Sequence, residues 1–156
     1  MPEMIEVVTE IAAPCAVVFD LELDVDVHSA SLAGSRERAV TLNGRRALQL
    51  GDEVTFRAHH FGVPWRMSSR ITAYERPRRF VDEQTSGPFT SLHHEHLFDA
   101  VTDEHTRMTD RLHITAPFGH IGVVTGRFLL APYLRRLLHQ RAAHIKALAE
   151  ATAATA

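Results

Sequence analysis

The sequence predicts an α+β domain in which a curved antiparallel sheet wraps around a long C-terminal helix. From Ser35 to Ile114, short strand-like segments alternate with turn signals. No helical pattern separates these segments, and parallel strands would need such crossover helices, so an antiparallel sheet is expected. From Phe118 to about Glu150 the apolar residues recur at helical spacing instead.

The N-terminal region predicts one strand and one short helix. Met4–Ile11 is rich in β-branched residues, as strands are. Pro14 is well placed at the start of a helix, and the apolar face of that helix is formed by Val17, Val18 and Leu21. The carboxylates that follow are interpreted as a solvated acidic segment, made up of Asp20, Glu22, Asp24 and Asp26.

Turn signals divide the central region into six further strands. Asn43-Gly44 is a tight-turn dipeptide, and Gly62 and Gly87 mark later turns. The predicted strands are residues 35–42, 52–61, 64–75, 78–86, 89–101 and 106–115. One helix cannot fill the concave side of a strongly bent sheet. A mostly apolar cavity is therefore expected between the two, and a solid core without a cavity is the alternative.

The C-terminal region predicts one long amphipathic helix. Pro132 lies inside the pattern and should kink or split the helix. A single domain is expected over residues 1–150, with a frayed tail at 151–156. The apolar stripe consists of Ile121, Val124, Phe128, Leu134, Leu137, Leu138, Ile145 and Leu148. The solvent-exposed face of this helix is predicted to carry Arg135, Arg136 and Arg141.

The composition argues against several partners and locations. The 156 residues include 17 Lys plus Arg and 19 Asp plus Glu, which gives a net charge of -2 and no electrostatic reason to bind nucleic acid. No apolar run reaches the roughly 18 to 20 residues of a membrane span, and the N-terminus lacks a basic signal-peptide start. Cys15 is the only cysteine, so no intrachain disulfide can form. A reduced, cytoplasmic domain without membrane insertion is expected.

Three stretches carry a resemblance to a known family. They are "LGDEVTFRAHHFGV", "RITAYERPRRFVDEQTSGPFTSLHHEHLFDAV" and "TRMTDRLHITAPFGHIG", followed by the long helix. In these stretches the chain resembles the SRPBCC (START/Bet v 1-like) superfamily, in particular its bacterial polyketide cyclase/dehydrase-like members. The resemblance covers nearly the whole chain, and "GPF" followed by H-x-H-x-F is its most specific part. It implies a helix-grip fold, with a seven-stranded antiparallel sheet around the C-terminal helix and a deep pocket for a hydrophobic molecule. It implies no single reaction, because the superfamily shares no catalytic motif.

Alternation along the strands decides which of the clustered histidines face this pocket. Leu92, His94, His96 and Phe98 share one face, which we expect to point inward because large apolar residues lie at both of its ends. If the apolar face of the next strand also points inward, the hairpin pairs Phe98 with Met108, His96 with Asp110 and His94 with Leu112. The outward neighbours are expected in solvent, with His93 and His113 close together. Histidines outside the strands, His28 among them, are also interpreted as solvated.

The same reasoning applied to the other strands gives a predicted pocket lining. Val54, Phe56, Ala58 and His60 form the less polar face of their strand, and Phe80, Asp82 and Gln84 share the inward face of another. The predicted ligand-binding residues are Phe56, His60, Trp65, Met67, Asp82, Gln84, His94, His96, Phe98, Met108, Asp110 and Leu112.

The polar residues of this lining allow three interpretations. The preferred one is a satisfied hydrogen-bond network that anchors the polar end of a ligand. The second is a metal site, because two histidines two apart on a strand can reach one ion and Asp110 could complete the set. The third is catalysis by proton transfer, for which the candidates are His94, His96 and Asp110. The preferred interpretation assigns no metal and no cofactor.

The expected function is binding or carriage of a small hydrophobic molecule, such as a lipid, a polyketide or an aromatic metabolite. The alternative is an enzyme of the polyketide cyclase/dehydratase type that uses a His–Asp pair, so enzymatic activity stays open. An interaction module without a ligand would be favoured if side chains filled the cavity. The exposed edges of the sheet also allow a homodimer.

Overall fold

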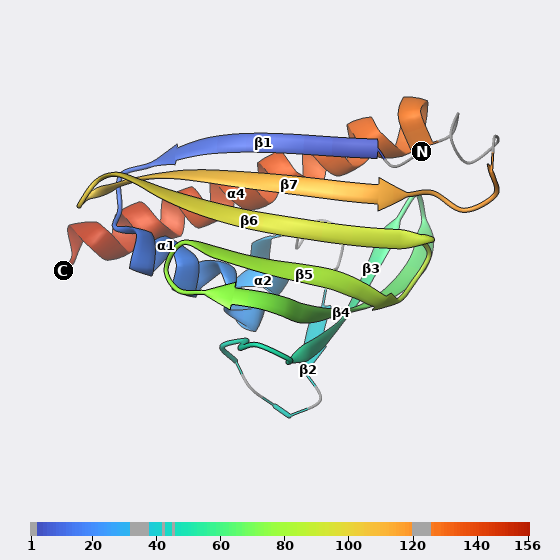
Figure 1. The fold of residues 1–156 in the computed structure, drawn as a ribbon, viewed down its shortest axis with the longest axis horizontal. Coiled ribbons are helices and arrows are strands. Elements are labelled where there is room, and N and C mark those ends of the chain that lie inside the picture. Colours follow the sequence, from blue (N-terminus) through green and yellow to red (C-terminus); the bar gives the residue numbers. More distant parts are fainter. Residues whose placement is uncertain (1–2, 32–37, 42, 45, 120–125) are drawn as a thin grey trace.

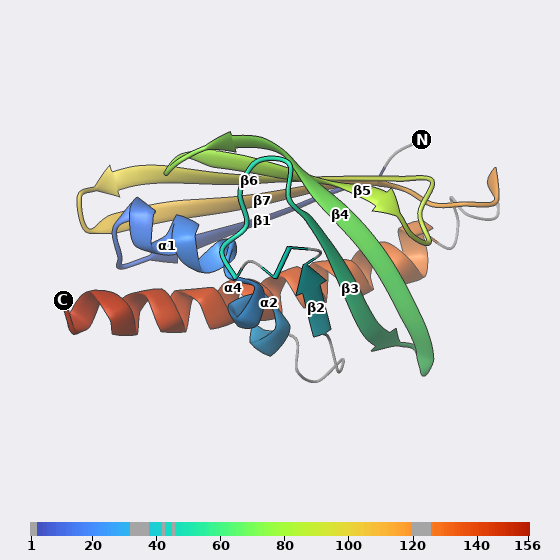
Figure 2. The same ribbon diagram turned by 90° about the horizontal axis from the view of Figure 1, so that it is seen from below.

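Seven antiparallel strands form one sheet that curves around the C-terminal helix (Figures 1 and 2). The computed structural model describes residues 3–31, 38–41, 43–44, 46–119 and 126–156. The strands are β1 (Glu3–Ile11), β2 (Arg38–Thr41), β3 (Glu53–His60), β4 (Val63–Glu75), β5 (Arg79–Ser86), β6 (Ser91–Thr102) and β7 (His105–Thr115). Their order across the sheet is β1-β7-β6-β5-β4-β3-β2. The predicted fold class is confirmed, whereas residues 35–37 and 42 of the predicted strand 35–42 lie outside the described residues.

The β6–β7 hairpin has the register that alternation predicted. Phe98 pairs with Met108, His96 with Asp110 and His94 with Leu112. This register is favoured because the turn after Thr102 is short and because it buries the apolar side chains of Phe98 and Met108 together on the concave side. The hairpin therefore carries both inward histidines on its concave side.

Four helical segments accompany the sheet in the part of the chain that the structure describes. They are α1 (Cys15–Glu22), α2 (Val25–Ser31), the π-helical turn η2 (Gly126–Leu130) and α4 (Ala131–Ala154). Pro132 lies in the first turn of α4, directly after the π-helical turn η2, so the helical segment changes type beside the proline, where the sequence predicted a kink or a split. The helix extends through Ala154, past residue 150 where the sequence placed its end. None of the described helices is long and apolar enough to cross a membrane.

The apolar stripe of α4 faces the sheet over most of its length. Leu138 and Ile145 are buried, and Leu134 packs against the core from its edge. Phe128 is 69% exposed, because it precedes α4 in the π-helical turn. Ile121 and Val124 of the predicted stripe lie outside the described residues.

Helix α1 fills one end of the concave side of the sheet. It lies between the sheet and α4, toward the C-terminal end of α4 (Figure 2). The ring of Phe19 in α1 makes edge contacts with Tyr74, Phe80 and Phe98 at centroid distances of 5.4, 5.5 and 5.4 Å. Such contacts between buried aromatic rings make this end a packed core. Open space is left toward the other end, beside the first half of α4.

Candidate functional site

The space beside the first half of α4 is a largely apolar cavity with a volume of about 140 Å³. Its walls come from the concave faces of the sheet strands and from one side of α4. Seven of the predicted ligand-binding residues line it: Phe56, His60, Trp65, Met67, Asp82, His94 and Leu112. Its other polar wall residues are His28, Tyr133 and Arg141.

The structure places the other five predicted residues away from the cavity. Phe98 and Met108 are 2% and 0% exposed and lie in the packed core, because the ring of Phe19 occupies the space in front of them. His96 and Asp110 lie behind the cavity wall. The side chain of Gln84 makes two hydrogen bonds with the backbone of Phe89. Its Nε2 donates to the Phe89 carbonyl at 2.8 Å, and its Oε1 accepts from the Phe89 N–H at 3.3 Å. Gln84 thereby holds Phe89 in the cavity wall.

Aromatic and imidazole rings form the part of the wall around His60. The hydroxyl of Tyr133 lies 2.7 Å from His60 Nδ1, and the indole N–H of Trp65 donates to the His60 carbonyl at 3.2 Å. The ring of Phe61 packs on Tyr133 at 4.5 Å, and Trp65 faces Phe89 at 6.4 Å. The Tyr133 hydroxyl and the Trp65 indole N–H are therefore both bonded to His60, and the apolar surfaces of these rings remain to contact a ligand.

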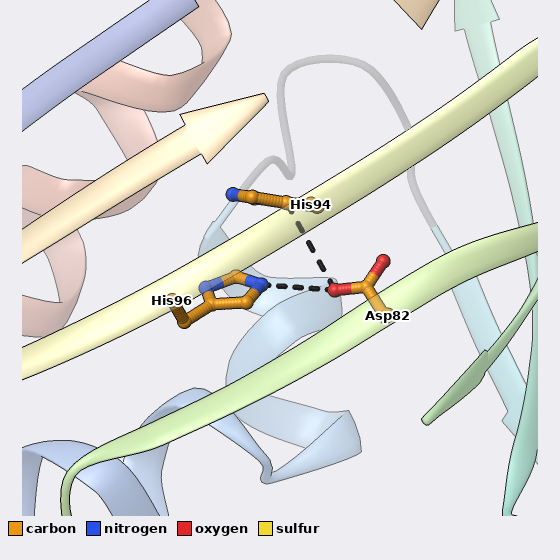
Figure 3. Close-up of side chains that lie close together, drawn as sticks. All are labelled: Asp82, His94 and His96. Carbon is orange, nitrogen blue, oxygen red and sulfur yellow. Dashed lines mark hydrogen bonds and ion pairs between the residues drawn. The ribbon is translucent and has the colours of Figure 1, made fainter. Parts of the chain in front are cut away.

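Two histidines and two aspartates form a buried group where three strands meet. On β6, His94 lies opposite Asp82 of β5 and His96 lies opposite Asp110 of β7. Diagonal contacts then link the pairs: His96 Nε2 is 2.9 Å from Asp82 Oδ2, and His94 Nε2 is 3.2 Å from Asp110 Oδ1. His96 Nδ1 also lies 2.9 Å from Asp110 Oδ1. Figure 3 shows both imidazoles reaching from β6 toward the Asp82 carboxylate.

Mutual contacts set the charge of each member of this group. Burial alone would lower the pKa of His96, but the carboxylates of Asp110 and Asp82 outweigh burial and raise the pKa to about 10. Burial also opposes ionisation of Asp82 and Asp110, yet the imidazoles hold the pKa of both carboxyls below their usual value. Burial and the charge of His96 lower the pKa of His94. At neutral pH His96 is therefore an imidazolium between two carboxylates, and His94 is neutral.

The prediction that Glu22 belongs to a solvated segment is wrong. The side chain is 1% exposed, and Oε2 lies 3.9 Å from His96 Nδ1. Burial, reinforced by the charge of Asp110, raises the pKa of Glu22 to about 7. A signal in the sequence could have placed it, because Glu22 follows the core residues Val18 and Phe19 by four and three positions on the same helix face.

Two further polar residues of the cavity wall, His28 and Arg141, were also placed in solvent by the sequence. Arg141 lines the cavity and acts electrostatically on Glu22 and Asp82. His28 stacks on Phe56 at 4.3 Å, lines the cavity and contacts the guanidinium of Arg141 through Nε2. Arg141 lies on the apolar stripe of α4, between Leu138 and Ile145, so its position in the helix predicts that it faces the sheet despite its charge.

The outward neighbours lie where alternation placed them. His93 and His113 face each other across the hairpin, with ring centroids 6.1 Å apart. His93 Nδ1 lies 3.1 Å from Glu83 Oε1, and both side chains are more than two-fifths exposed. They form surface pairs on the convex face and take no part in the cavity.

Within the described residues, two sets of side chains have donor atoms close enough to share a metal ion. One is Asp82, His94 and His96, and the other is Glu22, His96 and Asp110. The set proposed from the sequence, His94, His96 and Asp110, is not among them. Asp110 contacts His94 Nε2 and His96 Nδ1, and so lies on the opposite side of the two imidazoles from Asp82.

Comparison with known proteins shows likeness at the level of structure. No protein-family model matches the sequence, and no curated protein is significantly similar to it. The Zhui aromatase/cyclase from a Streptomyces species has a similar structure, with a TM-score of 0.79, 15% identity and coverage of 96% of this chain and 94% of that one.

Two further solved structures show the same likeness. Norcoclaurine synthase from Thalictrum flavum, in complex with dopamine and hydroxybenzaldehyde, has a TM-score of 0.71, 11% identity and coverage of 95% and 86%. A START superfamily protein from Mycobacterium smegmatis has a TM-score of 0.65, 12% identity and coverage of 97% of both chains. At these identities the likeness concerns the fold alone.

Proposed function

We propose that this chain, whose fold is SRPBCC-like and resembles that of polyketide cyclases, binds a compact hydroxylated aromatic molecule in its cavity. The observation that carries the proposal is the division of the cavity wall into two parts. Aromatic and aliphatic side chains form most of it, while Asp82 and His94 lie together on the β5 and β6 side. A pocket of this kind holds an apolar ligand body and fixes its orientation through a few polar contacts.

The volume of the cavity favours a ligand of one or two rings. An apolar cavity of about 150 Å³ holds one benzene molecule. The cavity here has about 140 Å³ and opens to the surface on one side, so a second ring can extend toward the opening. A long acyl chain would need more enclosed volume. Among the lipid, polyketide and aromatic ligands expected from the sequence, this favours the aromatic class.

The polar groups beside the cavity favour a ligand that donates a hydrogen bond. Asp82 is ionised, and its carboxylate can only accept. The Nε2 proton of His94 is directed at Asp110, so its Nδ1 also offers a lone pair. A hydroxyl on the ligand can donate to either acceptor. An ether at the same position would leave them without a donor, which costs binding free energy.

Structural neighbours support the aromatic class without defining the ligand. One neighbour is named an aromatase/cyclase, and another was solved with dopamine and hydroxybenzaldehyde. Both share the fold of this chain over more than nine-tenths of its length.

Binding of 2-naphthol by the metal-free protein is expected to change the fluorescence of Trp65 saturably, with one site per chain. Trp65 is the only tryptophan in the sequence and lines the cavity, so its emission reports on this site. The Ala58→Leu substitution places extra methyl groups in the cavity and should weaken binding at least about tenfold, or about 1.4 kcal/mol. The ether 2-methoxynaphthalene should bind more weakly than 2-naphthol by a similar factor.

Two controls test whether the binding is specific to the cavity and to the aromatic class. Ala143 is exposed on α4, so Ala143→Leu adds the same side chain outside the cavity and should leave binding unchanged. Palmitate in place of 2-naphthol tests the lipid class. Unchanged affinity in Ala58→Leu, or saturable binding of palmitate without binding of 2-naphthol, would contradict the proposal.

An enzyme of the polyketide cyclase/dehydratase type is the second candidate function, and the orientation of His94 favours it. The imidazole lines the cavity, is buried, and has its Nε2 held by Asp110 at 3.2 Å. An imidazole held in this way by a carboxylate can take a proton from a bound molecule through its other nitrogen. The substrate would then be a poly-β-carbonyl chain that loses a proton and closes into a ring.

Turnover by the second mechanism is expected to depend on His94. With a linear poly-β-carbonyl thioester, His94→Gln should lower the rate of ring closure about 100-fold or more, the usual contribution of general acid–base catalysis. His93→Gln, its outward neighbour, should retain the rate. Product formation at the spontaneous rate with the unmodified protein would remove this candidate, and the binding proposal would stand by itself.

The proposal places this binding in the cytoplasm, where a lone thiol such as Cys15 stays reduced. It also includes the homodimer expected from the sequence, for which β1 is available as an edge strand of the sheet.

A further inference from the structure

We infer that Asp82, His94 and His96 form a binding site for one divalent transition-metal ion of the zinc or iron(II) class, beside the cavity (Figure 3). The inference goes beyond the proposed function, since it concerns the protein without any organic ligand. It rests on the positions of three donor atoms, on a fourth residue behind them and on access from the cavity.

The donor atoms of the three residues converge. His96 Nε2 and His94 Nδ1 lie 2.9 and 3.9 Å from the same atom, Asp82 Oδ2, and all three donors are within 4.8 Å of one another. Metal–ligand bonds of 2.0 to 2.2 Å at tetrahedral angles place neighbouring donor atoms about 3.3 Å apart. The two separations bracket this value, so small side-chain rotations would bring all three donors to bonding distance of one ion.

Asp110 contacts both imidazoles on the side away from Asp82. It lies 3.2 Å from His94 Nε2 and 2.9 Å from His96 Nδ1, the ring nitrogens that face away from Asp82. Metal-binding histidines usually donate their second N–H to a carboxylate, which fixes the ring and makes the binding nitrogen a better ligand. Asp110 makes this hydrogen bond with His94 Nε2 and lies in ion-pair contact with His96 Nδ1, because β7 places it directly opposite His96 and diagonally from His94.

Two imidazoles and one carboxylate are a ligand set that zinc and non-haem iron(II) both accept, with coordination positions left open. Asp82 and His94 line the cavity, so an ion has a path of entry and its open positions would face a cavity ligand. The other set, Glu22, His96 and Asp110, has side chains only 1 to 2% exposed, and none of the three lines the cavity. The geometry therefore points to the Asp82 set.

Binding of the ion must release a proton. His96 Nε2 lies 2.9 Å from Asp82 Oδ2, and an ion would replace a proton held between these two atoms. The proton would pass to solvent, and the Asp82 carboxylate would hold the ion together with the two imidazoles. When bound, the ion would act as a Lewis acid for an oxygen atom of the ligand.

Zinc alone is the probe for the test. Protein without an affinity tag is stripped with a chelator and titrated with Zn²⁺ by calorimetry, and bound metal is counted after desalting. We expect one ion per chain. His94→Gln and Asp82→Asn should each reduce binding at least 100-fold, and Asp110→Asn should reduce it about 10- to 100-fold, as loss of an orienting carboxylate does.

The adjacent outward residues provide matched controls. His93→Gln and Glu83→Gln change a histidine and a carboxylate one position away on the convex face, and both should keep one ion per chain. Circular dichroism establishes that each variant is folded; a variant that is not folded is replaced by His94→Asn. Absence of stoichiometric binding, equal binding in folded His94 and Asp82 variants, or loss of binding in His93→Gln would each overturn the inference.

Discussion

Replacing Asp110 with asparagine is expected to lower the free energy of unfolding of the metal-free protein by about 3 to 5 kcal/mol at pH 7. The carboxylate is 2% exposed and contacts both His94 and His96. Asparagine keeps the shape of the side chain but removes the charge, so the buried imidazolium of His96 loses one of its two counter-charges. Removing one partner of a buried ion pair costs this much because the remaining charge stays out of water.

Urea denaturation measured by circular dichroism gives this free energy. Asp99→Asn is the matched control, because Asp99 lies on the same hairpin with its side chain exposed. The control should leave the free energy nearly unchanged. A loss below about 1 kcal/mol in Asp110→Asn would mean that His96 is neutral in the fold or that water reaches the group.

A second large effect is expected from pH. The free energy of unfolding of the metal-free protein should fall as the pH rises from about 6.5 to about 10. The pKa of His96 is raised from 6.5 to about 10 in the fold. A group whose pKa rises on folding contributes stability that is fully present below its unfolded pKa and is lost as the pH passes its folded pKa. The shift corresponds to at most about 5 kcal/mol.

Glu22 adds a change of the same sign at lower pH, since its pKa rises from 4.5 to about 7. Asp82 and Asp110 have lowered pKa values, so their contributions are lost only in acid, below the window of His96. The lowered pKa of His94 acts against stability only below about pH 6.5. The decline between pH 6.5 and 10 therefore reports mainly on His96.

Urea titrations at a series of pH values in His96→Gln test this assignment. The variant should have lower stability at pH 6.5 and a much weaker decline toward pH 10. His113→Gln, which changes an exposed histidine of the neighbouring strand, should keep the decline of the unmodified protein. An equal decline in both variants would place the titrating group elsewhere.

The arrangement of β6 and β7 could be predicted because alternation and apolar content agree there. Leu92 and Phe98 bracket the inward histidines, and a shift of one residue would have exposed both. The same rule placed Asp82 and His60 on the concave side. Residues on strands with one buried face were therefore predicted well.

Glu22, His28 and Arg141 were placed in solvent because the polar character of each side chain was given more weight than its position around its helix. The sequence also could not show that α1 fills one end of the concave side, since that depends on where the turn after Ile11 directs the helix. Once Phe19 occupies that end, Phe98 and Met108 become core residues. Asp82, the second partner of His96, was missed because β5 and β6 meet only in the folded sheet.

A crystal structure of the metal-free protein with 2-naphthol tests the central claim most directly. We expect the rings to lie between Phe56, Trp65 and Leu112, with the hydroxyl oxygen within hydrogen-bond distance of Asp82 or of His94 Nδ1. Naphthol bound outside the cavity, or bound inside with its hydroxyl toward solvent, would contradict the claim that Asp82 and His94 anchor a ligand.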